Sequence, residues 1–149
     1  MNYSAPDLTE NPPRSARVRL GGYVMLPRLL DKCRAELAGK NGEYHYACPL
    51  DQRYFEFVGI NQDDLKAEAA SGRSDAELLA WISTNSTTKP TILEIRDWSN
   101  YQSARVPSDP DSRDFFNGLH KEAAAHREDI ETWFDLLDLD DFVTFGGKA

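Results

Sequence analysis

Residues 14–59 read RSARVRLGGYVMLPRLLDKCRAELAGKNGEYHYACPLDQRYFEFVG, and most of the unusual side chains of this protein lie within them. The stretch opens with three closely spaced arginines and two adjacent glycines, and it contains both cysteines. Proline suits the first turn of a helix, because the N–H group that it lacks would have no helical partner there. We therefore expect helices that begin near Pro27 and at Pro49, and that end at Gly39 and Gly59, since glycine commonly follows the last turn.

Apolar residues recur along the first of these helices at the spacing of one buried face. They are Leu26, Leu29, Leu30, Cys33 and Leu37. The same spacing continues to the end of the chain, so we expect the large aromatic residues there to form the core: Trp81, Trp98, Tyr101, Phe115, Phe116 and Trp133.

Other helix ends are indicated by capping residues. Ser74 and Glu77 fit a capping box, in which two side chains bond the unpaired N–H groups of a first turn. Further helices are expected to begin near Asn61, at Pro90 and after residue 110. The pattern leaves open whether residues 110–141 form one helix or two with a break near residues 126–129.

One segment is expected to be extended instead of helical. Residues 43–47 alternate polar and aromatic side chains, which is typical of a short strand. This alternation would place Tyr44 and Tyr46 on one side.

Taken together, these patterns predict an all-α fold. We expect a single compact domain, residues 1–149, of about six or seven helices, with an extended N-terminal arm (1–22) and a loose C-terminal tail (142–149). A chain of 149 residues buries roughly 68–70% of its unfolded surface on folding, so it needs neither disulfides nor a metal for stability.

The charge of the chain bears on its partners. A formal net charge of −8 argues against binding to nucleic acid or to an anionic membrane, both of which attract surplus positive charge. Residues 1–53 nevertheless carry +2, from eight Lys or Arg and six Asp or Glu, whereas residues 54–149 carry −10, from nine and nineteen. Residues 1–53 could therefore bind an anion, or their arginines could pair with acidic residues of the C-terminal half.

We expect a soluble cytoplasmic protein with reduced thiols. The first 13 residues lack the apolar segment of a signal peptide, and no apolar run approaches the roughly 20 residues of a membrane span. Two cysteines are too few for a disulfide framework.

Four segments are similar to those of a known family. They are PRSARVRLGG (13–22), LPRLLDK (26–32), CPLDQR (48–53) and TWFDLLDLDD (132–141). In this order they resemble a bacterial family of unknown function, DUF5069, over nearly the whole chain. The resemblance implies a stand-alone bacterial domain without an established activity, and it assigns no catalytic residue.

A candidate anion site is built from Arg14, Arg17 and Arg19 together with the Gly21-Gly22 backbone. Guanidinium groups match carboxylate and phosphate geometry, and glycine lets a backbone approach a ligand closely. The glycines lack the spacing of a phosphate-binding loop. The whole face that we expect to bind a ligand comprises Arg14, Arg17, Arg19, Gly21, Gly22, Tyr44, Asp51 and Arg53.

A candidate nucleophile is Cys48, which would occupy the N-cap of the helix that begins at Pro49. Unpaired N–H groups at a helix N-terminus stabilise a thiolate, and His45, three residues earlier, could act as a base. The alternative is a structural cysteine beside a proline turn, since unpaired cysteines are usually buried.

No metal or cofactor is expected. His120 and His126 are six residues apart and do not share a helical face, and the two cysteines lack zinc-site spacing. Asp138, Asp140 and Asp141 end a helix, where carboxylates oppose its dipole. We expect them to pair with a base, either Arg53 or an N-terminal arginine, for example Arg17 with Asp140.

We therefore expect a non-catalytic domain that binds a small anionic ligand or a protein partner at the face formed by residues 14–53. An enzyme that uses Cys48 with His45, and a structural module that associates with itself, remain the alternatives. The sequence leaves the oligomeric state open.

Overall fold

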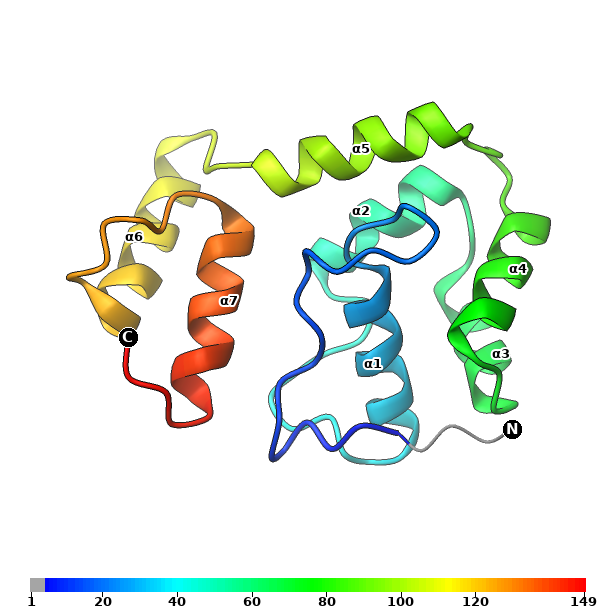
Figure 1. Ribbon diagram of the computed structural model, residues 1–149, viewed down its shortest axis with the longest axis horizontal. Helices are drawn as coiled ribbons and strands as arrows, with labels where there is room; N and C mark the ends of the chain where they lie inside the picture. The colour runs from blue at the N-terminus through cyan, green and yellow to red at the C-terminus, as the bar shows by residue number, and fades with distance from the viewer. Residues whose placement is uncertain (1–4) are drawn as a thin grey trace.

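The computed structural model describes residues 5–149, which form seven helices (Figure 1). No strand occurs among these residues, where Leu20 and Tyr23 form an isolated β-bridge. The all-α prediction is confirmed. The first four residues of the predicted arm lie outside the described residues. The helices are α1 (Leu26–Leu37), α2 (Pro49–Val58), α3 (Gln62–Ala70), α4 (Asp75–Asn85), α5 (Ile92–Ala104), α6 (Pro110–Ala124) and α7 (Trp133–Thr144).

Capping residues set most of the helix ends. The predicted capping box of Ser74 and Glu77 is present at the start of α4. A second box, formed by Thr91 and Glu94, starts α5, so this helix begins after Pro90 and not at it. Gly59 ends α2 with a φ of 69°, a left-handed conformation that glycine adopts without steric cost.

The C-terminal region contains two helices, which settles the question that the periodicity left open. α6 ends at Ala124 and α7 begins at Trp133, with Thr132 as its N-cap. α7 then continues to Thr144. The prediction that this helix ends at Asp141 was therefore wrong by three residues.

The predicted extended segment at residues 43–47 was also wrong, because residues 43, 46 and 47 lie in turns and none of the five is in a strand. Ala47 has a φ of 61°, which is incompatible with a regular strand. The two tyrosines of the segment contact different elements. The Tyr44 hydroxyl donates to Asp141 in α7 at 2.7 Å, and the Tyr46 hydroxyl donates to the backbone carbonyl of Gln62 at 2.7 Å.

The helices form two groups that α5 bridges (Figure 1). α1, α2, α3 and α4 enclose the larger cluster of buried apolar residues, whereas α6 and α7 form a hairpin with a smaller cluster of their own. A third cluster joins the two groups and includes Ala16 from the arm, Val24 and Met25 from the residues that follow it, and Phe134 from α7. Ala16, Val24 and Met25 are thus packed into the junction.

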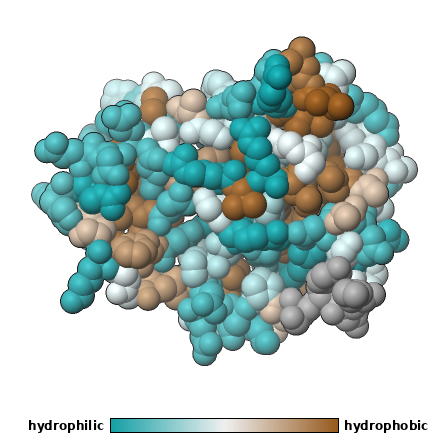
Figure 2. Space-filling model, viewed as in Figure 1, coloured by the Kyte–Doolittle hydropathy of each residue, from teal (hydrophilic) through white to brown (hydrophobic). Residues whose placement is uncertain are grey.

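Several apolar residues are not in the core. Tyr101 and Phe115, which we predicted to be buried, are each 63% exposed, and Leu37 is also exposed. Ile92 at the start of α5 is 89% exposed, and Figure 2 shows an apolar patch over this end of α5 on a largely polar face. Helical spacing identifies an apolar face but does not show whether another element covers it. Among the described residues, no helix is long and apolar enough to cross a membrane.

The charged residues of α1 connect it to the rest of the fold, and each of them pairs with a different part. The pairs are Arg28 with Asp141 in α7, Asp31 with Arg14 in the arm, Lys32 with Asp51 in α2, Arg34 with Asp75 in α4, and Glu36 with Lys66 in α3.

The pair between Arg28 and Asp141 is buried, with 6% and 9% of the side chains exposed. It is bidentate, with N···O distances of 2.7 and 3.1 Å. The Tyr44 hydroxyl also donates to this carboxylate, and the guanidinium lies 5.4 Å from the centre of the Tyr44 ring. The carboxylate therefore holds α7 against α1.

We predict that Arg28→Met lowers the free energy of unfolding by about 3–5 kcal/mol, because it leaves the Asp141 carboxylate buried without a cation. Urea denaturation measures this loss. The double variant R28M/D141L should recover most of it, since neither charge is then buried.

Arg96→Met is the matched control, because the Arg96 side chain is 64% exposed and its nearest carboxylate oxygen is 3.9 Å away. It should change stability by less than about 0.5 kcal/mol. An R28M protein as stable as this control would show that the pair does not hold α7.

Candidate functional site

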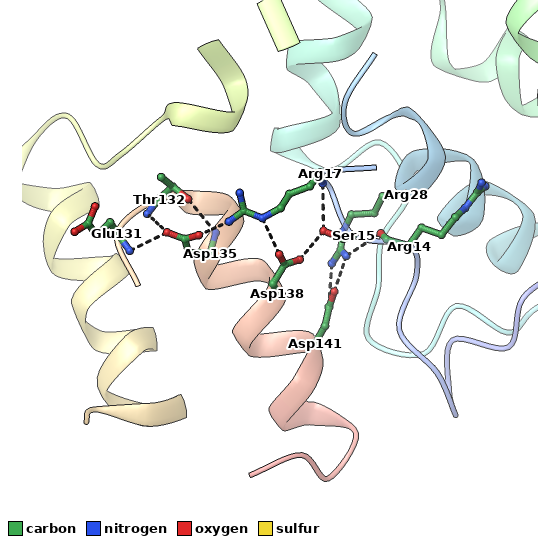
Figure 3. Close-up of polar contacts among 9 residues, drawn as sticks. All are labelled: Arg14, Ser15, Arg17, Arg28, Glu131, Thr132, Asp135, Asp138 and Asp141. Atoms are coloured by element: carbon green, nitrogen blue, oxygen red, sulfur yellow. Dashed lines mark hydrogen bonds and ion pairs between the residues drawn. The ribbon is translucent and has the colours of Figure 1, made fainter. Parts of the chain in front are cut away.

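The arginines of the predicted anion site contact four of the helices. Arg14 pairs with Asp31 at 2.9 Å and with Asp75 at 2.8 Å. Arg17 pairs with Asp138 at 2.9 Å and also with Asp135, as Figure 3 shows. Pairing of the arm with C-terminal acids, one of the two interpretations of the charge distribution, is thus observed for Arg17, although its partner is not Asp140.

Arg19 donates to the side-chain carbonyl of Asn100 at 2.9 Å. The two glycines form a tight turn, with φ of 58° and 83°. A Cβ atom on Gly21 would lie 2.6 Å from a methyl group of Leu79, and one on Gly22 would lie 3.2 Å from Ile95. Glycine is therefore required here for close packing of the arm against α4 and α5.

Two other residues of the predicted face belong to buried ion pairs. Tyr44 contacts the pair of Arg28 and Asp141. Asp51 accepts from Lys32 at 2.8 Å and from the Ala47 backbone N–H at 3.0 Å. Both residues thus have partners inside the protein.

Arg53 differs from the rest of the predicted face, because it lines an apolar groove. The groove has a volume of about 490 Å³, within the range of small-molecule sites. We call it the Arg53–Arg105 groove. Its lining residues are Pro49, Leu50, Arg53, Arg105, Phe115, Leu119, Trp133, Leu136 and Leu137.

Four helices position these side chains. The N-terminal part of α2 supplies Pro49, Leu50 and Arg53, and α6 and α7 supply the apolar wall. Arg105 is the C-cap of α5, and its carbonyl accepts a hydrogen bond of 3.0 Å from the Trp133 N–H at the start of α7. The groove therefore lies where the two groups of helices meet.

Neither guanidinium at this groove has a carboxylate partner among residues 5–149. Arg53 and Arg105 are both half-buried. Burial and the nearby Arg53 charge lower the pKa of Arg105 below its ordinary value. The two cations thus repel each other beside an apolar surface, and an anion placed between them would relieve this repulsion.

Two other hollows contain arginines, but their charges are already paired. A hollow of about 550 Å³ includes Arg14, Arg34, Asp31 and Asp75, which pair with one another. For Asp75, burial opposes the charged form, but hydrogen bonds from Arg14 and Arg34 outweigh burial and lower the pKa.

The second of these hollows, of about 350 Å³, includes Arg17 and Arg127 with the aspartates that they bind. An anion in either hollow would have to displace a carboxylate of the protein.

Cys48 is the N-cap of α2, as predicted. Its sulfur accepts a contact of 3.4 Å from the Lys32 ammonium. His45 is exposed, and among the described residues no hydrogen bond joins it to Cys48. The catalytic alternative therefore lacks a base in contact with the thiol in this structure, and it stays a prediction.

Among residues 5–149, no three His, Cys, Asp or Glu side chains come close enough to hold a metal ion. The His120 ring nitrogen Nε2 lies 2.6 Å from the backbone carbonyl of Arg127. This contact fixes the turn after α6.

We predict that iodoacetamide labels Cys48 and leaves Cys33 unlabelled in the folded protein, as peptide mass mapping would show. Cys33 is fully buried, and burial raises the pKa of its thiol to about 12. Since the thiolate is the reactive form, Cys33 should stay inert from about pH 7 to about pH 9.

Denatured protein, in which both thiols should react, is the control. Labelling of Cys33 at its denatured rate would contradict the prediction. A Cys48 thiol that reacts no faster than a model thiol at neutral pH would exclude its activation as a nucleophile.

Sequence signals for this site were incomplete. Arg53 was included in the predicted face, whereas Arg105 has no local pattern that marks it. The exposed Phe115 was predicted to be part of the core, because its spacing is that of any buried stripe.

Comparison with known proteins identifies the family of this chain. No curated protein matches the chain. A family model described as a domain of unknown function, DUF5069, matches residues 10–143. This match includes both arginines of the groove and every helix of the fold, except for the last residue of α7. The chain therefore belongs to the DUF5069 family.

Proposed function

We propose that this chain is a non-catalytic binding domain for a small amphipathic anion, which it holds in the Arg53–Arg105 groove. The main support is the pair of half-buried arginines beside an apolar surface, neither of which has a carboxylate partner among residues 5–149. The proposal keeps the anionic ligand expected from the sequence and moves its site from the arm to the junction of α2, α5, α6 and α7.

The charge of the protein makes this pair unusual. The chain has 25 acidic and 17 basic residues, so carboxylates are abundant, and Arg14 and Arg17 of the arm and both arginines of α1 pair with them. Guanidinium groups form strong bidentate hydrogen bonds with carboxylates and phosphates. Two adjacent guanidinium groups without such a partner therefore favour an anion from outside the chain.

The apolar wall indicates what the anion is attached to. Phe115 is 63% exposed and Leu119 is 39% exposed, and both line the groove beside Trp133. Covering such surface is favourable by about 25 cal/mol per Å² of apolar area removed from water. A ligand with an apolar body and one anionic end would satisfy both parts of the groove.

We predict that decanoate binds this protein more tightly than decanol does, because only decanoate can contact the arginines. Isothermal titration calorimetry gives both dissociation constants. Arg53→Gln and Arg105→Gln should each weaken decanoate binding by about tenfold or more, since a hydrogen bond to a charged group contributes about 1.5–3 kcal/mol.

Phe115→Ala should weaken decanoate and decanol alike, because it removes apolar contact only. Arg96→Gln is the matched control, since Arg96 lies on α5 but does not line the groove. Absence of decanoate binding, or binding that R53Q and R105Q leave unchanged, would refute the proposed site.

A further inference from the structure

We propose that the anionic group of the ligand is a phosphate monoester, carried by an apolar alcohol. This inference rests on the proposed function, because it specifies the ligand of the same groove. Its basis is the number of positive charges at the groove, together with a second, more polar hollow that shares both arginines.

Two groups of arginines elsewhere in the described part of the protein meet at least as many carboxylates as they have guanidinium groups. Arg14 and Arg34 contact two carboxylates, those of Asp31 and Asp75. Arg17 alone contacts two more, those of Asp135 and Asp138. If each guanidinium group at the groove is also matched by one negative charge, Arg53 and Arg105 together require an anion with two negative charges.

A phosphate monoester has this charge, whereas a carboxylate or a sulfate ester does not. It carries about −1.5 to −2 at neutral pH and has three strong acceptor oxygens. Each guanidinium offers five N–H donors in a planar fork. One phosphate group can therefore accept from both forks at once, and it leaves no net positive charge in the groove.

The second hollow gives the phosphate a polar side. It has a volume of about 340 Å³ and is lined by Arg53, Arg105, Tyr101, Ala104, Val106 and Ser108. Both arginines thus lie between an apolar groove and a hollow that has two hydroxyl-bearing side chains. A phosphate at this boundary would place its ester-linked chain in the groove and its oxygens toward the hydroxyl groups.

Few other groups at this site titrate near neutral pH. Among the residues that line the two hollows, the arginines and the Tyr101 phenol are the ionisable ones. Other ionisable side chains of α2, α5, α6 and α7 do not line the two hollows. Some of them pair with residues away from the groove: Asp51 of α2, His120 of α6, and Asp135, Asp138 and Asp141 of α7. The remaining ones are Glu56 of α2, Glu94, Arg96 and Asp97 of α5, Asp111, Arg113, Asp114, Lys121 and Glu122 of α6, and Asp140 of α7.

The test compares decyl phosphate, decyl sulfate and decanoate by isothermal titration calorimetry below their micelle-forming concentrations. At about pH 8, decyl phosphate should bind about tenfold or more tightly than the two singly charged ligands. Its affinity should fall about fourfold at about pH 5.5, because the second proton of a phosphate ester has a pKa near 6. Decyl sulfate keeps one negative charge at both pH values. Any change in its affinity between them therefore measures the effect of titration of the protein itself.

Arg53→Gln and Arg105→Gln should each reduce the affinity for decyl phosphate by about 10- to 100-fold and remove most of its advantage over decyl sulfate. Arg96→Gln should change neither. Equal affinity for the three ligands, with no pH effect specific to decyl phosphate, would overturn the phosphate assignment and leave the proposed function intact. Failure of all three to bind would overturn both.

Discussion

The fold depends on ion pairs made by one helix. All five charged residues of α1 pair with other parts of the chain, so α1 connects the arm and four other helices. Ion pairs of this kind contribute little net stability compared with apolar contacts, but the loss of one partner from a buried pair is costly. The pairs made by Arg28 and Lys32 are the most buried of the five, and they set where α7 and α2 lie.

This arrangement has a consequence for the groove. α2 forms one side of the Arg53–Arg105 groove and α7 forms part of the other. Each of these helices is tied to α1 by a buried ion pair, Asp51 to Lys32 and Asp141 to Arg28. Side chains that do not line the groove therefore help to set its width, and a ligand would meet a site whose walls are already in place.

The helices could be predicted from local signals. Pro49, Gly59 and the capping box at Ser74 act within a few residues of themselves, and each marks the helix end that the structure shows. Where a competing local signal existed, the sequence was less informative. Pro90 suggested a helix start, but the Thr91 capping box decided it.

The site could not be predicted in the same way, because it depends on distant partners. Arg17 and Asp138 are 121 positions apart in the sequence, and nothing local shows that the arm's arginines are already paired. Arg53 and Arg105 also lie far apart in sequence, and what distinguishes them is that they line one groove and that neither has a carboxylate partner in the described part of the chain. Phe115 has the spacing of a core residue, so only the positions of its neighbours reveal that it is exposed.

The central claim is that an anion binds at the groove and not at the basic arm. The most direct measurement is a titration with decyl phosphate followed by the ¹H–¹⁵N NMR signals of the arginine Nε–H groups. We predict that the signals of Arg53 and Arg105 shift with saturation, while those of Arg14, Arg17 and Arg28 stay in place because carboxylates of the protein hold them. Shifts at the arm's arginines with none at Arg53 and Arg105 would contradict the claim.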